Sequence, residues 1–180
     1  MKETNGIYTY EDYLKITDNN RYELIGGELI LVPAPKTIHQ LVKANLVWHI
    51  TSFVREYGLG KVLDAPTDVV LSHTDKPQPD ILFISASRLD IITEDNIKGA
   101  PDLVVEVLSP STAKYDRVEK SRMYYKYGVK EYWVVDPEIK VIEVYTAGGN
   151  NWIIANTYDE KGVLTSPLLK GLQINLGDVF

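Results

Sequence analysis

A glutamate stands in the middle of a strongly apolar run. Residues Asp102–Leu108 are predicted to form a buried strand, in which alternate side chains face the same side. Glu106 then shares a face with Val104 and Leu108. A buried, ionised carboxylate is costly unless a partner compensates for the lost hydration. Two interpretations stay open: Glu106 forms a structural ion pair with a lysine or arginine, or it binds a metal ion.

A second carboxylate begins another apolar run. Asp80 follows Gln78-Pro79 and opens a predicted strand over Asp80–Ile84. A Pro-Asp pair is also common in plain turns. Two strands that each carry a carboxylate near one end can bring the two groups together across a sheet. Carboxylate oxygens of this kind suit Mg²⁺ or Mn²⁺, which retain several waters and need one or two protein carboxylates.

A helix is predicted directly after the Glu106 strand, from about Thr112 to Tyr127, with Gly128 as its C-terminal stop. Asp116 and Lys120 lie four residues apart and therefore share a helix face. An exposed pair of this type would contribute only a few tenths of a kcal/mol. Because the helix is expected to pack back over the sheet, a lysine on its inner face would reach the Glu106 carboxylate.

These residues need a sheet and helices to position them. Gly26-Gly27 between two apolar runs predicts a two-residue hairpin, and apolar residues at helical spacing predict a long helix that covers one sheet face. The interleaved elements predict an α/β fold with a central mixed sheet. The expected elements are a capped helix at TYEDYLKI, hairpin strands at RYELI and ELILVP, a helix at Thr37–Tyr57, strands at Lys61–Asp64 and Thr67–Leu71, a short helix at SASRLDII with a serine cap, a strand at EYWVVD, a closing hairpin of VIEVYTA and WIIANTY, and a last strand at LQINL.

The composition limits the classes of protein to which this chain can belong. The 180 residues suit a single domain spanning 1–180, and the absence of cysteine excludes disulfides and thiolate metal sites. No apolar run is long enough for a membrane span, and the first residues lack the apolar core of a signal peptide, so a cytoplasmic protein is expected. The net charge of −6 argues against nucleic-acid binding driven by overall charge but leaves room for a local basic patch.

Several motifs together resemble one known family. The order of Gln-Pro-Asp, a glutamate on a later strand and a following helix resembles the PD-(D/E)XK nuclease superfamily. More closely, the chain resembles a bacterial family of "putative restriction endonucleases" from Tyr8 to Tyr145. The motifs that carry this resemblance are YTYEDYL, RYELIGGEL, PAPKTIHQ, QPDILFIS, GAPDLVVEVLSPST, DRVEKSRMYYKYGVKEYWVVDP and IEVY.

The resemblance implies a restriction endonuclease-like core with a central mixed sheet, flanking helices, and N- and C-terminal hairpins. It implies a Mg²⁺- or Mn²⁺-dependent endonuclease, a hydrolase of phosphodiester bonds acting on nucleic acid, with DNA the expected substrate. Asp80 and Glu106 match the two acidic metal ligands. The superfamily pattern places its catalytic lysine two residues after the acid, where this chain has Leu108, and Lys120 on the following helix is the candidate replacement.

Four further residues are candidates for supporting roles: Glu28 on the second hairpin strand, His39 in the first turn of the long helix, Gln78 two residues before Asp80, and Asp116 beside Lys120. An exposed hairpin position is the other interpretation for Glu28, and it weighs more for Glu23. A surface or capping role is equally open for His39. The basic residues of the helix, Lys114, Arg117, Lys120, Arg122 and Lys126, do not all face one way.

Two functions from different classes remain. One is the metal-dependent endonuclease, and a homodimer is then plausible because small nucleases that cut both strands often pair. The other is a catalytically inactive nuclease-fold protein that binds nucleic acid or another protein, with Asp80, Glu106 and Lys120 as a structural network. The position of Lys120 separates them, since a catalytic lysine must place its ammonium within about 4 to 6 Å of the Glu106 carboxylate.

Overall fold

The centre of the molecule is a six-stranded mixed sheet. A computed structural model describes residues 7–109 and 115–180. The strands lie in the order β10-β9-β8-β7-β5-β3, and every neighbouring pair is antiparallel except β7 and β8. Their bounds are β3 Gly60–Asp64, β5 Ile81–Ser85, β7 Leu103–Val107, β8 Glu131–Asp136, β9 Val141–Ala147 and β10 Trp152–Asp159. The three strands predicted at the centre, β5, β7 and β8, are neighbours.

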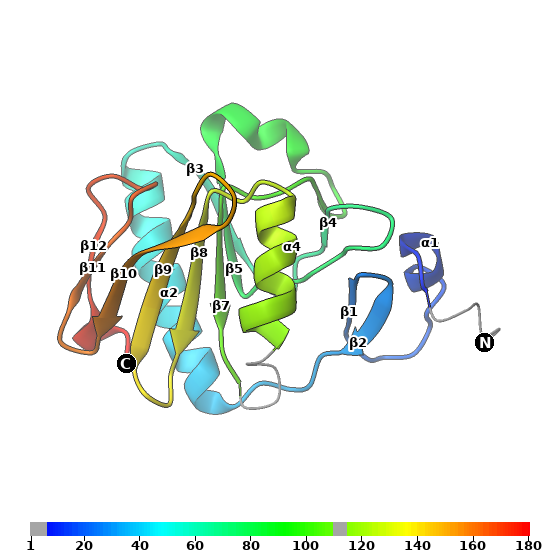
Figure 1. Cartoon of the computed structure of the whole chain (residues 1–180), viewed down its shortest axis with the longest axis horizontal. Coiled ribbons are helices and arrows are strands. Elements are labelled where there is room, and N and C mark those ends of the chain that lie inside the picture. The colour runs from blue at the N-terminus through cyan, green and yellow to red at the C-terminus, as the bar shows by residue number, and fades with distance from the viewer. Residues whose placement is uncertain (1–6, 110–114) are drawn as a thin grey trace.

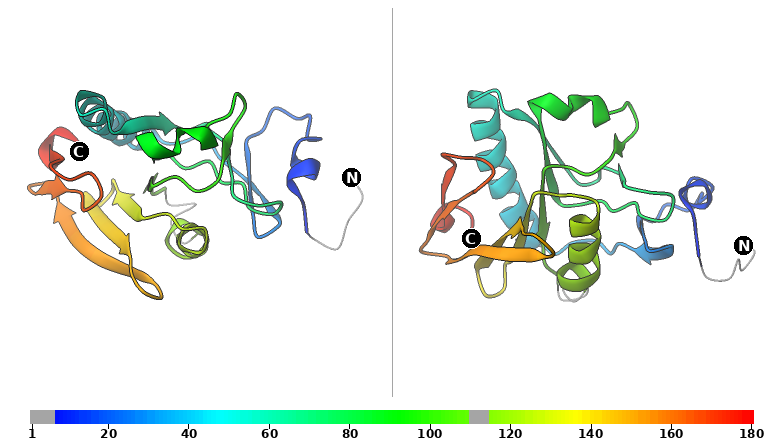
Figure 2. Two further views of the ribbon diagram at one scale, coloured as in Figure 1. Left: turned by 90° about the horizontal axis from the view of Figure 1, so that it is seen from above. Right: turned by 45° about the horizontal axis from the view of Figure 1, so that its top comes forward.

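Helices cover both faces of this sheet (Figures 1 and 2). The long helix α2, Thr37–Glu56, lies on one face. On the other lie a π-helical turn, η2 (Asp116–Lys120), and the short helix α4 (Ser121–Lys126). The parallel pairing of β7 with β8 requires a crossover connection, and the η2–α4 segment is part of it. The chain therefore places Lys120 directly over the strand that carries Glu106.

Alternation along β7 separates two cores, as the sequence predicts. Leu103, Val105 and Val107 belong to the core beneath α2, whereas Val104 and Leu108 belong to the core beneath α4. Glu106 is the one polar residue in the five-residue strand, and all five residues are buried. Its side chain consequently projects toward α4.

The N-terminal hairpin lies beside the central sheet. Strands β1 (Tyr22–Ile25) and β2 (Glu28–Leu31) pair around Gly26 and Gly27, whose φ angles of 58° and 82° are those that a tight two-residue turn needs. A four-residue helix, α1 (Tyr10–Tyr13), precedes it with the expected Thr9 capping box. Leu24 of β1 exchanges backbone hydrogen bonds with Lys76 at 3.0 and 2.5 Å, which fixes the hairpin to the chain just before Asp80.

Some boundaries differ from the sequence-based prediction. Thr112–Lys114, at the start of the predicted helix, lie outside the described residues. The π-helical turn η2 then runs from Asp116 to Lys120, and α4 follows it and ends at Lys126. The SASRLDII segment is a 3₁₀ helix, η1 (Ala86–Ile91), and no cap bond from the Ser85 side chain forms. The remaining elements are β4 Val69–Val70, β6 Ile97–Lys98, β11 Val163–Thr165, β12 Gln173–Asn175 and η3 Leu176–Asp178, of which β6, β11 and η3 were not predicted.

A second element covers α2, in agreement with its broad apolar surface. Leu46 is fully buried, and Phe53 packs against a core that includes the residues of β11, β12 and η3. This cover is incomplete, because Leu41 and Trp48 remain 57% and 65% exposed. In the described part of the chain, no helix has the length and apolar character needed to cross a membrane.

Candidate active site

A cleft of about 690 Å³ opens where β5 and β7 meet the η2–α4 segment. Its wall combines residues of the N-terminal hairpin, the start of α2, the strand ends and η2. Acidic and basic side chains share this wall: Glu23, Asp80, Glu106 and Asp116 on one hand, Arg21, Lys36, Lys43 and Lys120 on the other. Residues that are far apart in the sequence therefore meet in one place.

Strand register brings the two predicted carboxylates together. In the β5–β7 ladder Ile81 pairs with Val105 and Leu82 with Val104, so one further step places Asp80 opposite Glu106. Directly opposite residues have Cβ atoms about 5 Å apart. Both side chains line the cleft.

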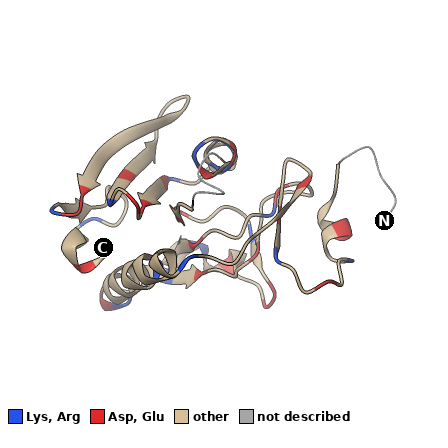
Figure 3. Ribbon diagram, turned by 90° about the horizontal axis from the view of Figure 1, so that it is seen from below, with Lys and Arg blue, Asp and Glu red and all other residues tan. Residues whose placement is uncertain are grey.

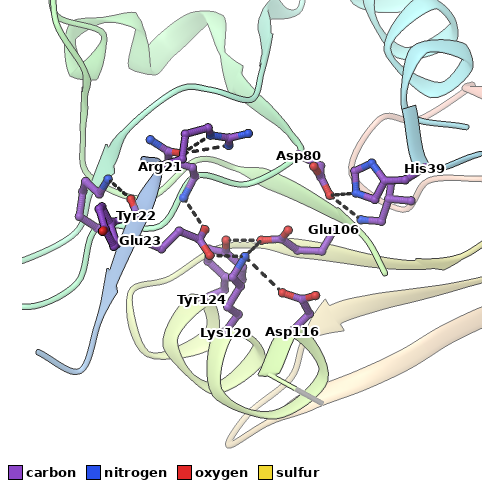
Figure 4. A network of polar contacts seen from close by, with 12 residues as sticks. Arg21, Tyr22, Glu23, His39, Asp80, Glu106, Asp116, Lys120 and Tyr124 are labelled. Atoms are coloured by element: carbon purple, nitrogen blue, oxygen red, sulfur yellow. Dashed lines mark hydrogen bonds and ion pairs between the residues drawn. The ribbon is translucent and has the colours of Figure 1, made fainter. Parts of the chain in front are cut away.

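Lys120 lies at the centre of a buried charge network (Figure 4). Its ammonium Nζ is 3.2 Å from Glu106 Oε1, 3.2 Å from Asp116 Oδ1 and 2.9 Å from Glu23 Oε2. The expected approach of Lys120 to Glu106 is confirmed. The alternative of a solvent-exposed Asp116–Lys120 pair is wrong, because both residues are buried and two further carboxylates contact the same ammonium.

Burial controls the protonation of this network. It raises the pKa of Glu106 well above its usual value; Lys120 opposes this effect, and the neighbouring Asp116, Asp80 and Glu23 add to it. Burial lowers the pKa of Lys120, but its three carboxylate neighbours outweigh burial, so the pKa lies well above the usual value. Lys120 therefore stays charged, whereas Glu106 binds a proton more readily than an ordinary glutamate does.

Asp80 is held from the opposite side. Its Oδ2 accepts a hydrogen bond from the backbone N–H of Val107 at 2.9 Å and lies 3.1 Å from His39 Nε2. Burial alone would lower the pKa of His39, but Asp80 raises it above the usual value. The predicted supporting residue His39 thus contacts the Asp80 carboxylate and lines the cleft.

The other predicted supporting residues separate into two groups. Asp116 and Gln78 line the cleft; Gln78 accepts from Arg21 and donates to Asp68. Glu28 is exposed and is not part of the cleft wall. The hairpin glutamate that reaches the site is Glu23, on the other strand, so the order in which the sequence ranked them is reversed.

Sequence reasoning assigned no site role to Glu23 or Tyr124. The Tyr124 hydroxyl donates to Glu106 Oε1 at 2.6 Å. Tyr124 lies four residues after Lys120, on the helix face that the sequence had already marked, and this spacing is the signal that could have found it. Glu23 gave a weaker signal, because its burial depends on how the hairpin docks.

The basic residues of η2 and α4 do not form a patch. Lys120 is buried, Arg117 pairs with Glu143, and Arg122 and Lys126 are exposed beside Glu119 and Asp75; Lys114 lies outside the described residues. Figure 3 shows acidic and basic positions on the same helices. The described basic residues of η2 and α4 therefore offer no single positive surface.

The chemistry of the donor set fits a divalent cation. Asp80 and Glu106 would supply hard oxygen ligands to such an ion, and Mg²⁺ needs only one or two of these because it keeps several waters in its shell. Glu23 and Asp116 add two further carboxyl groups to the same cleft wall, which also favours a cation. Among the residues described, no group of three or more acidic or histidine side chains is arranged to hold a metal ion. The site thus offers a pair of carboxylates.

Known proteins similar to this chain indicate one family and one fold. Residues 10–177 match the family described as "Putative restriction endonuclease" (Uma2). The chain belongs to this family. No curated protein matches the sequence. Among solved structures, a crystal structure described as a "putative nuclease belonging to DUF820" from Anabaena variabilis is similar over 96% of this chain and 97% of the other, with a TM-score of 0.79 and 22% identity. At that identity the likeness establishes a shared fold.

Proposed function

We propose that the protein is a Mg²⁺- or Mn²⁺-dependent endonuclease that hydrolyses phosphodiester bonds in DNA. The observation that carries the proposal is the buried Lys120 ammonium, 3.2 Å from Glu106 in a cleft that also contains Asp80. A point charge on a flexible stem can take its place from a neighbouring helix as well as from the strand itself. Family membership supports the same reaction class.

Each residue has a distinct role in this proposal. Asp80 and Glu106 would hold the metal ion, which supplies Lewis-acid activation of phosphate and water when bound. Lys120 stabilises the negative charge that develops on the phosphate during attack. His39 and the Val107 N–H orient the Asp80 carboxylate, and Tyr124 orients that of Glu106.

The test is cleavage of supercoiled plasmid DNA while Mg²⁺ or Mn²⁺ is titrated. The wild type should cut only with metal, and Glu106→Gln should abolish both cleavage and metal binding measured by calorimetry. Lys120→Ala should abolish cleavage and leave metal binding largely intact, since lysine does not ligate the ion. Lys120→Arg should restore little activity, because a planar guanidinium does not reproduce a compact ammonium.

The matched control is Lys126→Ala, which removes an exposed lysine from the same helix. It should cut like the wild type. Because Lys120 is buried among carboxylates, Lys120→Ala also has to be checked for folding by circular dichroism. A wild type that binds no metal and cuts no DNA would refute the endonuclease.

One observation favours the second candidate, a nuclease-fold binding module. Lys120 contacts three carboxylates at once, as a structural network would. In that case Lys120→Ala would lower stability without changing nucleic-acid affinity, and metal would have no effect on either.

We also propose a homodimer, because small nucleases that cut both strands of a duplex often pair. The exposed Leu41 and Trp48 on α2 offer apolar surface for a second copy. Sedimentation velocity at low micromolar concentration should give a dimer that Trp48→Glu dissociates. A wild-type monomer would contradict this assignment.

A further inference from the structure

Glu23 connects the N-terminal hairpin with the candidate catalytic lysine. Its Oε2 lies 2.9 Å from Lys120 Nζ, closer than either of the other two carboxylates of the network. Its Oε1 accepts the backbone N–H of Gln78 at 2.7 Å. With 5% of its surface exposed, Glu23 makes these contacts away from bulk water. One side chain therefore joins η2 to the segment that leads into Asp80.

The hairpin itself is anchored to that segment. Besides the Leu24–Lys76 backbone pair, Arg21 donates to Gln78 Oε1 from Nε at 3.2 Å and from Nη2 at 2.9 Å. Lys76 Nζ donates to the Tyr22 carbonyl at 2.8 Å. Figure 4 shows Arg21, Tyr22 and Glu23 on the side of the site opposite His39. Glu23 is thus presented to Lys120 from a fixed strand.

Lys120 needs such an anchor because its stem is flexible. Its position is set by the partners of the ammonium, and one of them, Glu106, has a second task as a proposed metal ligand. Asp116 lies on the same π-helical turn as Lys120 and moves with it. Glu23 is the partner that belongs to a different element and is not assigned to the metal.

We propose that Glu23 is a positioning residue for Lys120, so that the N-terminal hairpin forms part of the catalytic site. The proposal rests on the proposed function for its catalytic consequence. Its physical content, that Glu23 fixes the Lys120 ammonium, is independent of catalysis. The superfamily motif of two acids and a lysine contains no residue of this hairpin.

The test uses Glu23→Gln in the full chain and has two readouts. The first is the ¹⁵N–¹H NMR signal of the Lys120 side-chain ammonium, assigned by its loss in Lys120→Arg. The second is steady-state cleavage of plasmid DNA as a function of DNA and Mg²⁺ concentration. Glu119→Gln is the matched control, because it removes an exposed carboxylate next to Lys120 in the sequence.

In Glu23→Gln the ammonium signal should shift and exchange faster with water, and kcat should fall by about 10- to 100-fold, the usual effect of losing an orienting partner. KM for DNA and the Mg²⁺ dependence should not change. Glu119→Gln should match the wild type in every readout. Glu23→Asp keeps the charge but is one methylene too short for both contacts, so it should shift the signal and lower kcat less.

Three results in Glu23→Gln would overturn the proposal. An unchanged ammonium signal in Glu23→Gln would show that Glu23 does not hold Lys120. A lower melting temperature with unchanged kcat would make Glu23 structural only, and a changed Mg²⁺ dependence would make it a metal ligand. If Glu23→Gln does not fold, a wild-type signal and kcat in Glu23→Asp would overturn it. A wild type without cleavage refutes the nuclease, while the NMR signal still decides whether Glu23 fixes Lys120.

Discussion

Glu106 accepts a hydrogen bond from the Tyr124 hydroxyl at 2.6 Å, which is shorter than its 3.2 Å contact with Lys120. Tyr124 is fully buried, and burial together with Glu106 raises its pKa well above the usual value, so it remains a hydrogen-bond donor. Lys120 contacts the same Glu106 oxygen. The carboxylate is thereby oriented by a neutral donor as well as by a cation.

Tyr124→Phe should lower the free energy of unfolding by about 1 to 2 kcal/mol, because a buried hydrogen bond is lost while the ring still packs. Urea denaturation measures the change. Tyr125→Phe is the control, since its hydroxyl donates to the Gly148 carbonyl at a partly exposed position. Equal losses in the two variants would show that the Tyr124–Glu106 bond adds nothing specific.

Glu131 is a second buried carboxylate, away from the cleft. It accepts hydrogen bonds from Trp133 Nε1, Ser166 Oγ and the Leu168 N–H, each at 2.7 Å. Burial raises its pKa above the usual value, and the three donors only partly offset this effect. Glu131 thus binds a proton more tightly in the folded chain than in the unfolded chain.

This shift predicts a pH dependence of stability. Between the unfolded pKa near 4.5 and the higher folded value, the folded state binds more protons, so the contribution of Glu131 to stability falls as pH rises. Glu131→Gln removes that decrease. Its stability relative to the wild type, from urea curves at pH 4.5 and 7.5, should therefore improve with pH. Glu138→Gln, at an exposed site, should show no such trend. A constant difference for Glu131→Gln would contradict the shift.

At the scale of elements, the sequence predicts what depends on local pattern. Gly26-Gly27 marked the hairpin, and the apolar runs marked β5, β7 and β8 because buried strands are continuous in hydrophobicity. The π-helical turn was not predictable, since its residues also fit an ordinary α-helix. The contact between Glu23 and Lys120 was missed because strand alternation says which face Glu23 occupies but not what docks on that face.

One buried lysine contributes to the docking of the hairpin. Lys76 is fully buried; its Nζ donates to the Tyr22 carbonyl and to Asp68 Oδ1, and it lies 3.5 Å from the centre of the Tyr13 ring. Burial lowers its pKa, and Asp68 partly restores it. The Lys76 side chain therefore connects three parts of the chain: strand β1, helix α1, and Asp68, which directly precedes β4.

Lys76→Met should lower the free energy of unfolding by about 3 kcal/mol, because it removes one partner of a buried ion pair. Amide hydrogen exchange should accelerate in Tyr22–Leu31 more than in Glu131–Asp136. Lys61→Met, at an exposed position of β3, is the control and should change neither quantity. Uniformly faster exchange across both strands would mean that the lysine stabilises the whole molecule and not the hairpin contact.

At the scale of the whole molecule, metal binding should stabilise the fold by mass action. A ligand at a hundredfold excess over its Kd adds about 2.7 kcal/mol to the free energy of unfolding. Mg²⁺ and Mn²⁺ should therefore raise the melting temperature of the wild type, and Glu106→Gln should lose the increase. A melting temperature that does not change when Mg²⁺ or Mn²⁺ is added would count against a metal at Asp80 and Glu106.

Strand β10 lies at one edge of the central sheet, and an exposed sheet edge affects how copies of a protein associate at high concentration. Its outer edge is a template on which another extended chain can form hydrogen bonds, and Ile153 and Ile154 are exposed there. The ladder with β9 skips Ala155, so a bulge interrupts the strand between Ile154 and Asn156. A bulge bends and twists an edge, which limits regular pairing to the short stretches on either side. This irregularity protects the sheet from edge-to-edge aggregation.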